Sequence, residues 1–482
     1  MTSEGIRTAP PFARLPVLVV AAAAVALLVA TSIRYAHGFD ELYFLVAGRD
    51  HLTWGYFDQP PLVPLLAGTL DRWFPGSLVA LRLPMALAAG AGAVVTALTA
   101  RELGGGRAAQ VMAAGAYATS GLMIISHWVA TYALDPFFWT LVVFLLVRWT
   151  RTRRDGLLVW AGAVTAVSLQ TKFLIPALWG AVLVSALVLG PRKLVSRPKL
   201  WLGALIAVVA TLPTFLWQAT HGWAYTRMGE VVAAEFPGYL AFARDGVLGA
   251  GMGIGVLALL YGMWRLFRSP DLVPYRYLAA ALLLVVAVIV GTHGRSYYLM
   301  SLYSLPFAAA ATELSRRNLV RWWKIPVGIA FALSAAVTVA GLPVWPASTK
   351  ATSFGPFPLG TVFAQGETAQ QQLADGVGQA YQSLPGPVRR ETAVYGEIYP
   401  FAAAVEYYGP RYGINDVYSG HRGYWYFGRP PDSARNVLFA GFDPALLRPY
   451  FSSVTEVVPG LMWLYTGRKQ SWETIWPEVK KQ

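Results

Sequence analysis

The segment of residues 35–66, YAHGFDELYFLVAGRDHLTWGYFDQPPLVPLL, places carboxylates among aromatic side chains. Asp40 and Glu41 are adjacent, and Asp50 and Asp58 follow. A carboxylate that is held in place can remove a proton from a hydroxyl group, which is the chemistry of a general base. Asp58 precedes two prolines, which fix the backbone and prevent a helix there. Such a stiff turn suits the binding of metal or phosphate, and an ordinary loop turn would have the same sequence.

Other polar residues suited to chemistry occur singly in later loops. Lys172 and Arg295 are candidate anion binders, and the guanidinium of Arg295 can hold a phosphate with two parallel donors. Both residues could instead anchor the chain to lipid headgroups. His221, within WQATHGWAY, is either a ligand or an interfacial hydrogen-bonding residue. Asp40 and Glu41 have a plain alternative too, because charged residues are common where a spanning helix ends.

The composition shows what surrounds these residues. The chain has 482 residues, of which 56% are hydrophobic and 13% charged, and its mean hydropathy is +0.46. Soluble domains have about 25% charged residues, so this composition indicates a polytopic membrane protein. The net charge of +14 comes from short basic clusters between apolar segments, which is not the pattern of a nucleic-acid-binding protein. The absence of cysteine excludes disulfides, thiolate metal sites and cysteine nucleophiles.

Apolar segments of spanning length recur along the first 345 residues. The first follows Arg14, is roughly 20 residues long, and is expected to be an uncleaved helix with its N-terminus in the cytoplasm. With the later segments it makes about eleven transmembrane helices. The later segments lie near residues 79–100, 108–126, 133–149, 157–170, 173–190, 200–217, 246–264, 275–291, 298–313 and 325–343.

The connections between these segments alternate in charge. If the first helix runs outward, every cytoplasmic connection is rich in arginine or lysine, namely RELGGGR, RWTRTRRD, PRKLVSRPK, WRLFRSPD and ELSRRNLVRWWK. This agrees with the positive-inside rule. The loops on the other side contain the acidic, aromatic and histidine residues, so we expect one site that opens away from the cytosol. An odd number of spans places the C-terminal segment outside as well.

The C-terminal segment, residues 346–482, is more polar and is predicted to be a small α/β domain of about 130 residues. Residues 369–384 have an amphipathic helical pattern, 392–399 a strand pattern, and 436–457 the pattern strand, helix, strand. Residues 418–430, YSGHRGYWYFGRP, could stack on sugar rings, although core packing and membrane contact explain the same aromatics. GAGMGIG at 249–255 has the spacing of a nucleotide-binding loop, but it lies within an apolar segment and indicates close helix packing.

Five blocks of the chain, in order, are HGFDELYFLVAGRDHLTWGYFDQPPL, TYALDPFFWTLVVFLL, LQTKFLIPALW, WQATHGWAY and GRSYYLMSLYSLPFAAA. Together they resemble the polyprenyl-phosphate-dependent GT-C glycosyltransferases. The resemblance is to glycosyltransferase family 39-like enzymes, which include protein O-mannosyltransferases and aminoarabinose transferases, and it spans roughly residues 10–345. The implied fold is a transmembrane GT-C domain, residues 1–345, whose first outer loop, 35–78, holds the catalytic acid, followed by the outer domain 346–482.

The resemblance implies roles for particular residues. Asp40 corresponds to the candidate general base, with Glu41 beside it, and Asp58 to an acidic residue that helps to hold a divalent metal or the lipid phosphate. His221 is a possible metal partner of Asp58. Some family members have lysine where this chain has Gln59.

Without that lysine, other residues must bind the donor phosphate. We expect Lys172 and Arg295 to do so, with Tyr297 and Tyr298 beside them. Asp135 matches an acidic position near the start of the fourth helix and is expected to have a supporting or acceptor role, as is Gln59.

The implied reaction moves a sugar from a polyprenyl monophosphate to an acceptor hydroxyl on the outer face of the membrane, with inversion. The usage of Ala, Gly, Arg and Trp indicates a GC-rich bacterium, which favours a bacterial plasma membrane over the endoplasmic reticulum. No nucleotide cofactor is needed, since the donor contains no nucleotide. The acceptor could be a protein, glycolipid, polysaccharide or small metabolite. Two other functions fit parts of the pattern. One is a lipid or sugar transporter or flippase, which would show internal repeats and polar residues near the bilayer midplane. The other is an oligosaccharide ligase with a pyrophosphate-linked donor.

Overall fold

The computed structural model describes residues 8–317, 324–346, 348–350, 352–354, 357–359 and 362–481. The chain forms two compact units. The first, called here the helical unit, contains residues 1–34, 79–217 and 229–362, and the second, the sheet unit, contains residues 35–78, 218–228 and 363–482. The sheet unit therefore combines the first outer loop with most of the C-terminal segment. A separate domain at 346–482 stays a prediction.

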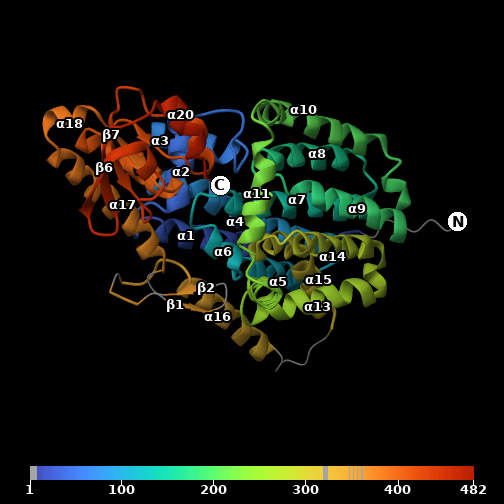
Figure 1. The fold of residues 1–482 in the computed structure, drawn as a ribbon. Coiled ribbons are helices and arrows are strands. Elements are labelled where there is room, and N and C mark those ends of the chain that lie inside the picture. The colour runs from blue at the N-terminus through green and yellow to red at the C-terminus, as the bar shows by residue number, and fades with distance from the viewer. Residues whose placement is uncertain are drawn as a thin grey trace. The chain divides into compact units, whose positions relative to one another are not determined.

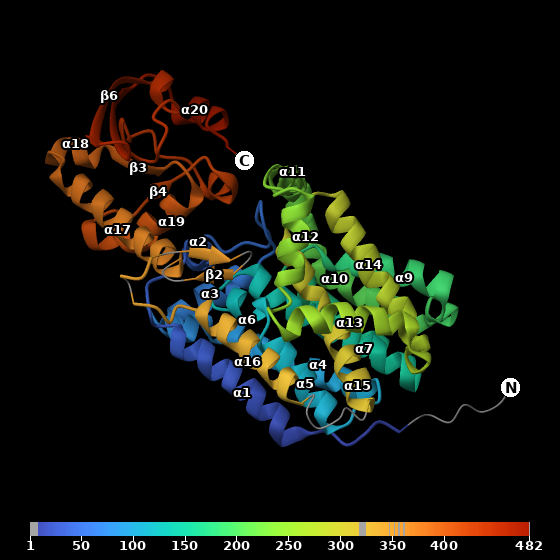
Figure 2. The same cartoon turned by 90° about the horizontal axis from the view of Figure 1, so that it is seen from below.

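Each apolar segment predicted from the sequence contains a helix. The helices outside the C-terminal segment are α1 (Arg14–Thr31), α2 (Phe39–Arg49), α3 (Leu62–Trp73), α4 (Leu78–Glu102), α5 (Arg107–Ala118), α6 (Gly121–Ile125), α7 (Thr131–Thr152), α8 (Gly156–Leu169), α9 (Ile175–Leu189), α10 (Pro198–Thr220), α11 (Arg227–Ala234), α12 (Tyr239–Leu248), α13 (Ile254–Arg268), α14 (Arg276–Gly291), α15 (Ser304–Arg316) and α16 (Lys324–Ala340). Short 3-10 helices join them at η1 (Arg192–Leu194), η2 (Ala224–Thr226), η3 (Pro270–Tyr275) and η4 (Ser296–Leu302). In the helical unit α16 packs against α5 and α13, although it follows them in sequence by many residues (Figure 2).

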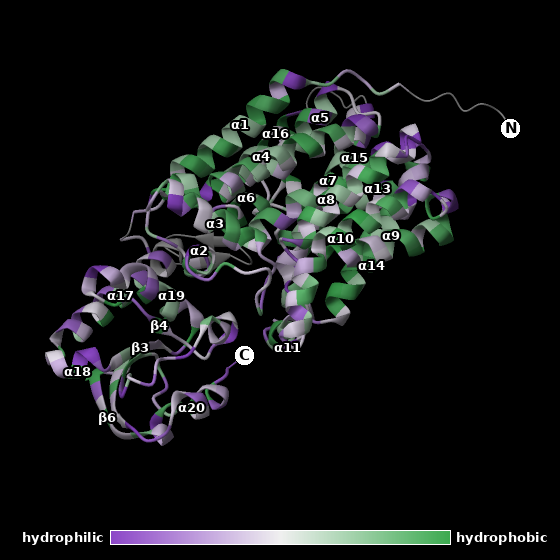
Figure 3. Cartoon of the chain, turned by 90° about the horizontal axis from the view of Figure 1, so that it is seen from above, coloured by the Kyte–Doolittle hydropathy of each residue, from purple (hydrophilic) through white to green (hydrophobic). Residues whose placement is uncertain are grey.

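Five helices of the described chain are long and apolar enough to cross a membrane. They are α1, α4, α7, α10 and the continuous η3–α14 segment, and α8, α9 and α16 are shorter apolar helices. Hydrophobic residues run along these helices, whereas the strands and helices of the C-terminal segment are mixed in character (Figure 3). The fold is thus mostly helical and suited to a membrane, and the number of spans beyond these five stays a prediction.

The segment predicted to span at residues 246–264 is not one continuous helix. α12 ends at Leu248 and α13 begins at Ile254, with Gly251 at φ +107° and Gly253 at φ +86° between them. A Cβ atom on Gly251 would lie 2.6 Å from the carbonyl oxygen of Thr119, so the glycines permit both the turn and the close approach. The expected close packing of GAGMGIG is observed, but at a helix break instead of within a helix.

Buried carboxylates pair with arginines where the helices of the helical unit end in arginine-rich connections. Glu102 is 2% exposed, and its carboxylate accepts a hydrogen bond of 2.6 Å from the Nε atom of Arg151. Glu313 is 4% exposed and accepts a hydrogen bond of 2.8 Å from the Nε atom of Arg265. Buried charges are stable only when they are paired, so these ion pairs fix the helix ends against one another.

The sheet unit contains a five-stranded sheet with the order β4-β3-β5-β7-β6. Its strands β6 and β7 are labelled in Figure 1. β3 is parallel to β4 and β5, with Val394 opposite Leu438, and β7 is antiparallel to β5 and β6. All residues of β3 and β5 are buried, as expected for central strands covered on both faces. The strands are β3 (Thr392–Gly396), β4 (Val417–Tyr418), β5 (Asn436–Ala440), β6 (Phe451–Val458) and β7 (Met462–Arg468).

Helices flank this sheet, and a small hairpin precedes it. The helices are α17 (Val362–Ser383), α18 (Gly386–Arg390), α19 (Tyr399–Tyr408) and α20 (Trp472–Glu478), with 3-10 helices η6 (Gly409–Tyr412), η7 (Arg422–Phe427) and η8 (Arg448–Tyr450). The hairpin consists of β1 (Thr352–Phe354) and β2 (Phe357–Leu359). The predicted helix at 369–384 and the strands at 392 and 436 are confirmed. The predicted helix between the last two segments is the short η8, followed by β6.

Candidate active site

The Asp40–Glu41 pair lies in the first turn of α2, in the sheet unit. Gly38 precedes the helix, and its backbone N–H donates to the Oε2 atom of Glu41 at 2.8 Å. Glu41 is completely buried, so its carboxylate caps the helix. The N-terminus of a helix favours negative charge, which suits a carboxylate at Asp40. The Glu41 carboxylate is thus engaged by the backbone of Gly38, whereas Asp40 is partly exposed, and the catalytic role of both residues stays a prediction.

A tyrosine from the C-terminal segment binds the Asp40 carboxylate. Tyr399 is the first residue of α19, and its hydroxyl donates to Oδ1 of Asp40 at 2.7 Å. The ring of Tyr399 stacks on His421, with ring centroids 5.5 Å apart, and its backbone N–H donates to Nδ1 of His421 at 3.2 Å. Burial, together with the charges of Arg422 and Lys481, lowers the pKa of His421 to about 4. A neutral His421 therefore accepts this hydrogen bond and fixes Tyr399 against Asp40.

Asp58 belongs to the same group of side chains. The hydroxyl of Tyr43 donates to its Oδ1 atom at 3.0 Å, and the rings of Tyr43 and Tyr399 lie 4.9 Å apart. Burial raises the pKa of Asp58 to about 6, while the Tyr43 hydrogen bond and the charge of Arg422 act in the opposite direction. A Cβ atom on Gly423 would lie 1.9 Å from the Tyr43 hydroxyl, so a larger residue at this position of η7 would displace that hydroxyl. We call Asp40, Tyr43, Asp58, Tyr399 and Arg422 the acidic group.

Gln59 offers a buried hydrogen-bond donor beside Asp58. Its side chain is 3% exposed, and within the described part of the chain its Nε2 atom has no hydrogen-bond partner. Its backbone carbonyl accepts from the N–H of Tyr56 at 3.1 Å, which closes the turn before the prolines. A buried amide donor without a protein partner is costly, so this atom suits a ligand oxygen.

His221 lies in the sheet unit, where its ring centroid is 6.0 Å from that of Tyr426 and its Nδ1 atom is 3.1 Å from the hydroxyl of Thr220. Asp58 is engaged by Tyr43. No group of three or more His, Asp or Glu side chains suited to a metal ion occurs among the residues that the structure describes. The metal role of Asp58 and His221 stays a prediction.

The predicted phosphate-binding residues come together in the helical unit. The Nζ atom of Lys172 lies 3.9 Å from the ring centroid of Tyr298 and 5.3 Å from that of Tyr297. Arg295 donates from Nη1 to the hydroxyl of Tyr297 at 3.0 Å and from Nε to Glu235 at 3.0 Å. We call Lys172, Arg295, Tyr297 and Tyr298 the basic group. Its cations are held by ring faces and a carboxylate at the ends of apolar helices.

Asp135 is the acidic neighbour of the basic group. It is 3% exposed in the first turns of α7, and the hydroxyl of Ser168 donates to its Oδ1 atom at 3.1 Å. Lys172, 8% exposed, is its electrostatic partner. The charge of Lys172 is thus partly balanced within the protein, which supports a positioning role for Asp135.

The structure brings Asp40 and Asp58 together in one unit, and Asp135, Lys172, Arg295, Tyr297 and Tyr298 in the other. Sequence reasoning missed Tyr43, Tyr399 and Glu235. Tyr43 lies three residues after Asp40 on α2, and that helical spacing was the available signal. Nothing local to Tyr399 or Glu235 indicates their partners, because these contacts join distant segments.

Comparisons with known proteins agree with this architecture. The model of a family described as dolichyl-phosphate-mannose-protein mannosyltransferase matches residues 58–217. No curated protein matches the chain.

Solved structures match over nearly the whole chain. Apo ArnT from Cupriavidus metallidurans has a TM-score of 0.62 at 15% identity, with 93% of this chain and 97% of that chain covered. The arabinofuranosyltransferase AftD from Mycobacteria has a TM-score of 0.53 at 15% identity, with 94% and 40% covered. The oligosaccharyltransferase AglB from Archaeoglobus fulgidus, solved with an inhibitory peptide and a dolichol-phosphate, has a TM-score of 0.51 at 13% identity, with 96% and 75% covered.

These similarities show the fold. The chain has the GT-C glycosyltransferase fold, which confirms the resemblance predicted from the sequence.

Proposed function

We propose that this protein is an integral membrane, inverting glycosyltransferase that moves a sugar from a polyprenyl-monophosphate donor to an acceptor hydroxyl on the outer face of a bacterial plasma membrane. The fold supports the class of enzyme, and one of the similar structures, ArnT, is described with bound undecaprenyl phosphate. The observation on which the proposal chiefly depends is the partly exposed Asp40 carboxylate, which Tyr399 and the capped start of α2 hold in place.

Asp40 is the proposed general base. Its Oδ1 atom accepts from Tyr399, and the carboxylate so held would take the proton of the acceptor hydroxyl. Such assistance contributes about a hundred- to ten-thousand-fold to the rate. The new glycosidic bond forms as the bond between the anomeric carbon and the phosphate oxygen breaks. A single base acting opposite the leaving phosphate gives inversion.

The leaving polyprenyl phosphate gains negative charge as this bond breaks. Lys172 and Arg295 are the proposed cations that stabilise it, with Tyr297 holding Arg295 in place. Glu235 accepts hydrogen bonds from Arg295, and a phosphate bound to Arg295 would take the place of that carboxylate. For the buried amide of Gln59 we propose an acceptor-binding or supporting role. In its ionised form Asp58 would help to hold a divalent metal ion or the lipid phosphate, the role that the resemblance implies for it.

The proposed topology has about eleven spans, a cytoplasmic N-terminus and an outer C-terminal segment. The alternation of basic connections supports this topology. The ion pairs support it too, because Glu102 pairs with Arg151 and Glu313 with Arg265, and each pair joins two connections assigned to the cytoplasm. The aromatic segment 418–430, which includes Arg422 of the acidic group, is then available to contact the acceptor.

An oligosaccharide ligase is the second candidate, because the chain also shares its fold with AglB. The two are separated by supplying the purified full-length enzyme, in proteoliposomes, with lipid-monophosphate and lipid-pyrophosphate sugars extracted from producing cells. We expect release of polyprenyl phosphate from the monophosphate donor alone. Use of the pyrophosphate donor would support the ligase, and movement of either lipid across the bilayer without release of phosphate would support a flippase. Mass spectrometry of envelope glycans with and without the protein then identifies the acceptor.

A further inference from the structure

A strongly basic pocket lies at the far end of α7 from Asp135. Four of its lining residues are the cations Arg153, Arg192, Lys193 and Arg197, and the described lining includes no carboxylate. Its volume is about 550 Å³. From Asp135 to Arg153 the helix rises by roughly 27 Å, so this pocket and the basic group are separate features of the helical unit.

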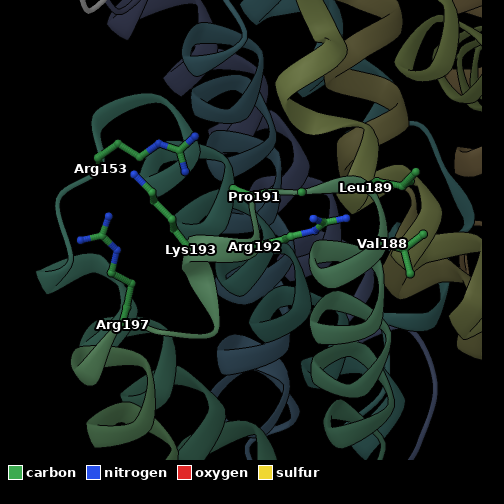
Figure 4. Close-up of a pocket in the computed structure, with 8 residues that line it drawn as sticks. Arg153, Val188, Leu189, Pro191, Arg192, Lys193 and Arg197 are labelled. Carbon is green, nitrogen blue, oxygen red and sulfur yellow. The ribbon is translucent and has the colours of Figure 1, made fainter. Parts of the chain in front are cut away.

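The local fold aims three of these cations at one space. Arg153, Lys193 and Arg197 point toward one another in Figure 4, from the residue after α7, from η1, and from the residue before α10. Arg153 has φ +53°, and its guanidinium lies 4.9 Å from the ring of the buried Trp149. Cations gathered in this way repel one another, which an anionic ligand would relieve.

One neighbouring carboxylate balances part of this charge. Asp155 accepts from the indole of Trp149 at 2.9 Å and lies 3.4 Å from Nη1 of Arg197. It thus orients both the stacked ring and one guanidinium while leaving the pocket with a net positive charge.

The wall beside the cations is apolar and exposed. Val188 and Leu189 line the pocket at 68% and 56% exposed, and exposed apolar side chains continue along α9 and α10. They include Val184, Leu187, Trp201, Leu202, Leu205, Val208 and Val209. A soluble anion would bury no apolar area on this surface, whereas an acyl chain would.

We propose that this pocket binds the headgroup of an anionic phospholipid, with the phosphate among Arg153, Lys193 and Arg197 and an acyl chain along Val188 and Leu189. In the membrane orientation proposed above it lies at the cytoplasmic surface, where anionic lipids attract juxtamembrane cations. Lipid binding at this pocket does not depend on sugar transfer, because none of its residues belongs to the acidic group or the basic group.

The test measures lipid binding by the full-length protein in a neutral detergent. Native mass spectrometry detects the bound lipid after addition of phosphatidylglycerol or phosphatidylcholine. We expect wild-type protein to retain phosphatidylglycerol selectively. R153Q/K193Q/R197Q should bind it about a hundredfold more weakly, because each cation contributes roughly fivefold. K193Q alone changes one exposed residue and should cost about fivefold, which keeps the test valid if the triple variant folds poorly.

R107Q/R154Q/K199Q is the matched control, because it removes the same charge from the same end of the helices without touching the pocket lining. An equal loss in this control would overturn the proposal in favour of a diffuse surface field. Failure of wild type to prefer phosphatidylglycerol would also overturn it. Full competition by millimolar inorganic phosphate would assign the site to a soluble anion and refute the lipid assignment.

Discussion

Replacing Tyr43 by phenylalanine should move the acidic limb of the pH–activity profile. Tyr43 donates to Asp58 at 3.0 Å, and this hydrogen bond holds the pKa of Asp58 below the value that burial alone would give. Hydrogen bonds to charged groups contribute about 1.5–3 kcal/mol, which corresponds to roughly 1–2 pH units. If ionised Asp58 is required, activity rises as the pH rises through about 6 in the wild type and through a correspondingly higher pH in Y43F.

The size of the effect at neutral pH follows from these values. With its pKa near 6, Asp58 is about 90% ionised at pH 7, and the shift lowers this to about 10–50%. Y43F should therefore lose about twofold to tenfold in kcat/KM at pH 7 and regain the wild-type rate near pH 9. The assay measures release of polyprenyl phosphate in proteoliposomes from pH 5 to 9.

Y56F is the matched control for this experiment. Tyr56 is a buried tyrosine of the same loop, but its hydroxyl donates to the backbone carbonyls of Ala47 and His51. The acidic limb of the Y56F pH–activity profile should lie at the same pH as that of the wild type. An unmoved limb in Y43F, or an equal shift in Y56F, would refute the assignment of the limb to Asp58.

Three further substitutions test other parts of the structure. Y399F removes the hydrogen bond to Asp40 and should lower kcat about tenfold with little change in KM for the lipid-linked sugar. The control is Y408F, which should leave kcat unchanged because the Tyr408 hydroxyl contacts His37 instead. A rise in KM alone for Y399F would contradict this prediction. E235Q frees Arg295 and should tighten donor binding about twofold to fivefold in a titration, and weaker binding would show that Glu235 orients Arg295 instead. E102Q breaks a buried ion pair with Arg151 and should lower the unfolding free energy by about 3 kcal/mol, seen as a lower Tm than in the exposed control E478Q; an unchanged Tm would mean that the pair is not stabilising.

The helices could be predicted well from the sequence because spanning length and apolar character are local properties. The break between α12 and α13 was missed, since hydropathy does not register a turn that two glycines make within an apolar run. The central strands β3 and β5 were predicted because strands buried on both faces are continuously apolar.

The first outer loop differs more from its sequence pattern. Aromatic and acidic residues together are typical of a segment lying at a membrane surface, but α2 is largely buried and packs against α3 and α19. Tyr43, Phe44, Tyr56 and Phe57 of this loop are buried, and hydropathy alone does not distinguish buried aromatic residues from an interfacial belt.

The candidate site could be predicted as a set of residue types but not as a set of contacts. Asp40 and Asp58 were found because carboxylates stand out in an apolar chain. Their hydrogen-bond partners could not be found, since Tyr399 is 359 residues away from Asp40 and Glu235 is 60 residues away from Arg295. Such pairings depend on how the chain folds back and leave no periodic pattern in the sequence.

The central claim is that Asp40 removes the proton of the acceptor hydroxyl. The most direct measurement compares sugar transfer by D40N and D50N in proteoliposomes with donor and acceptor extracted from producing cells. Asp50 is an acidic residue of the same loop whose side chain pairs with Arg49. We expect D40N to transfer at least about a hundredfold more slowly with donor binding and Tm unchanged, and D50N to keep the wild-type rate. Transfer by D40N at the wild-type rate would contradict the assignment of Asp40 as the base.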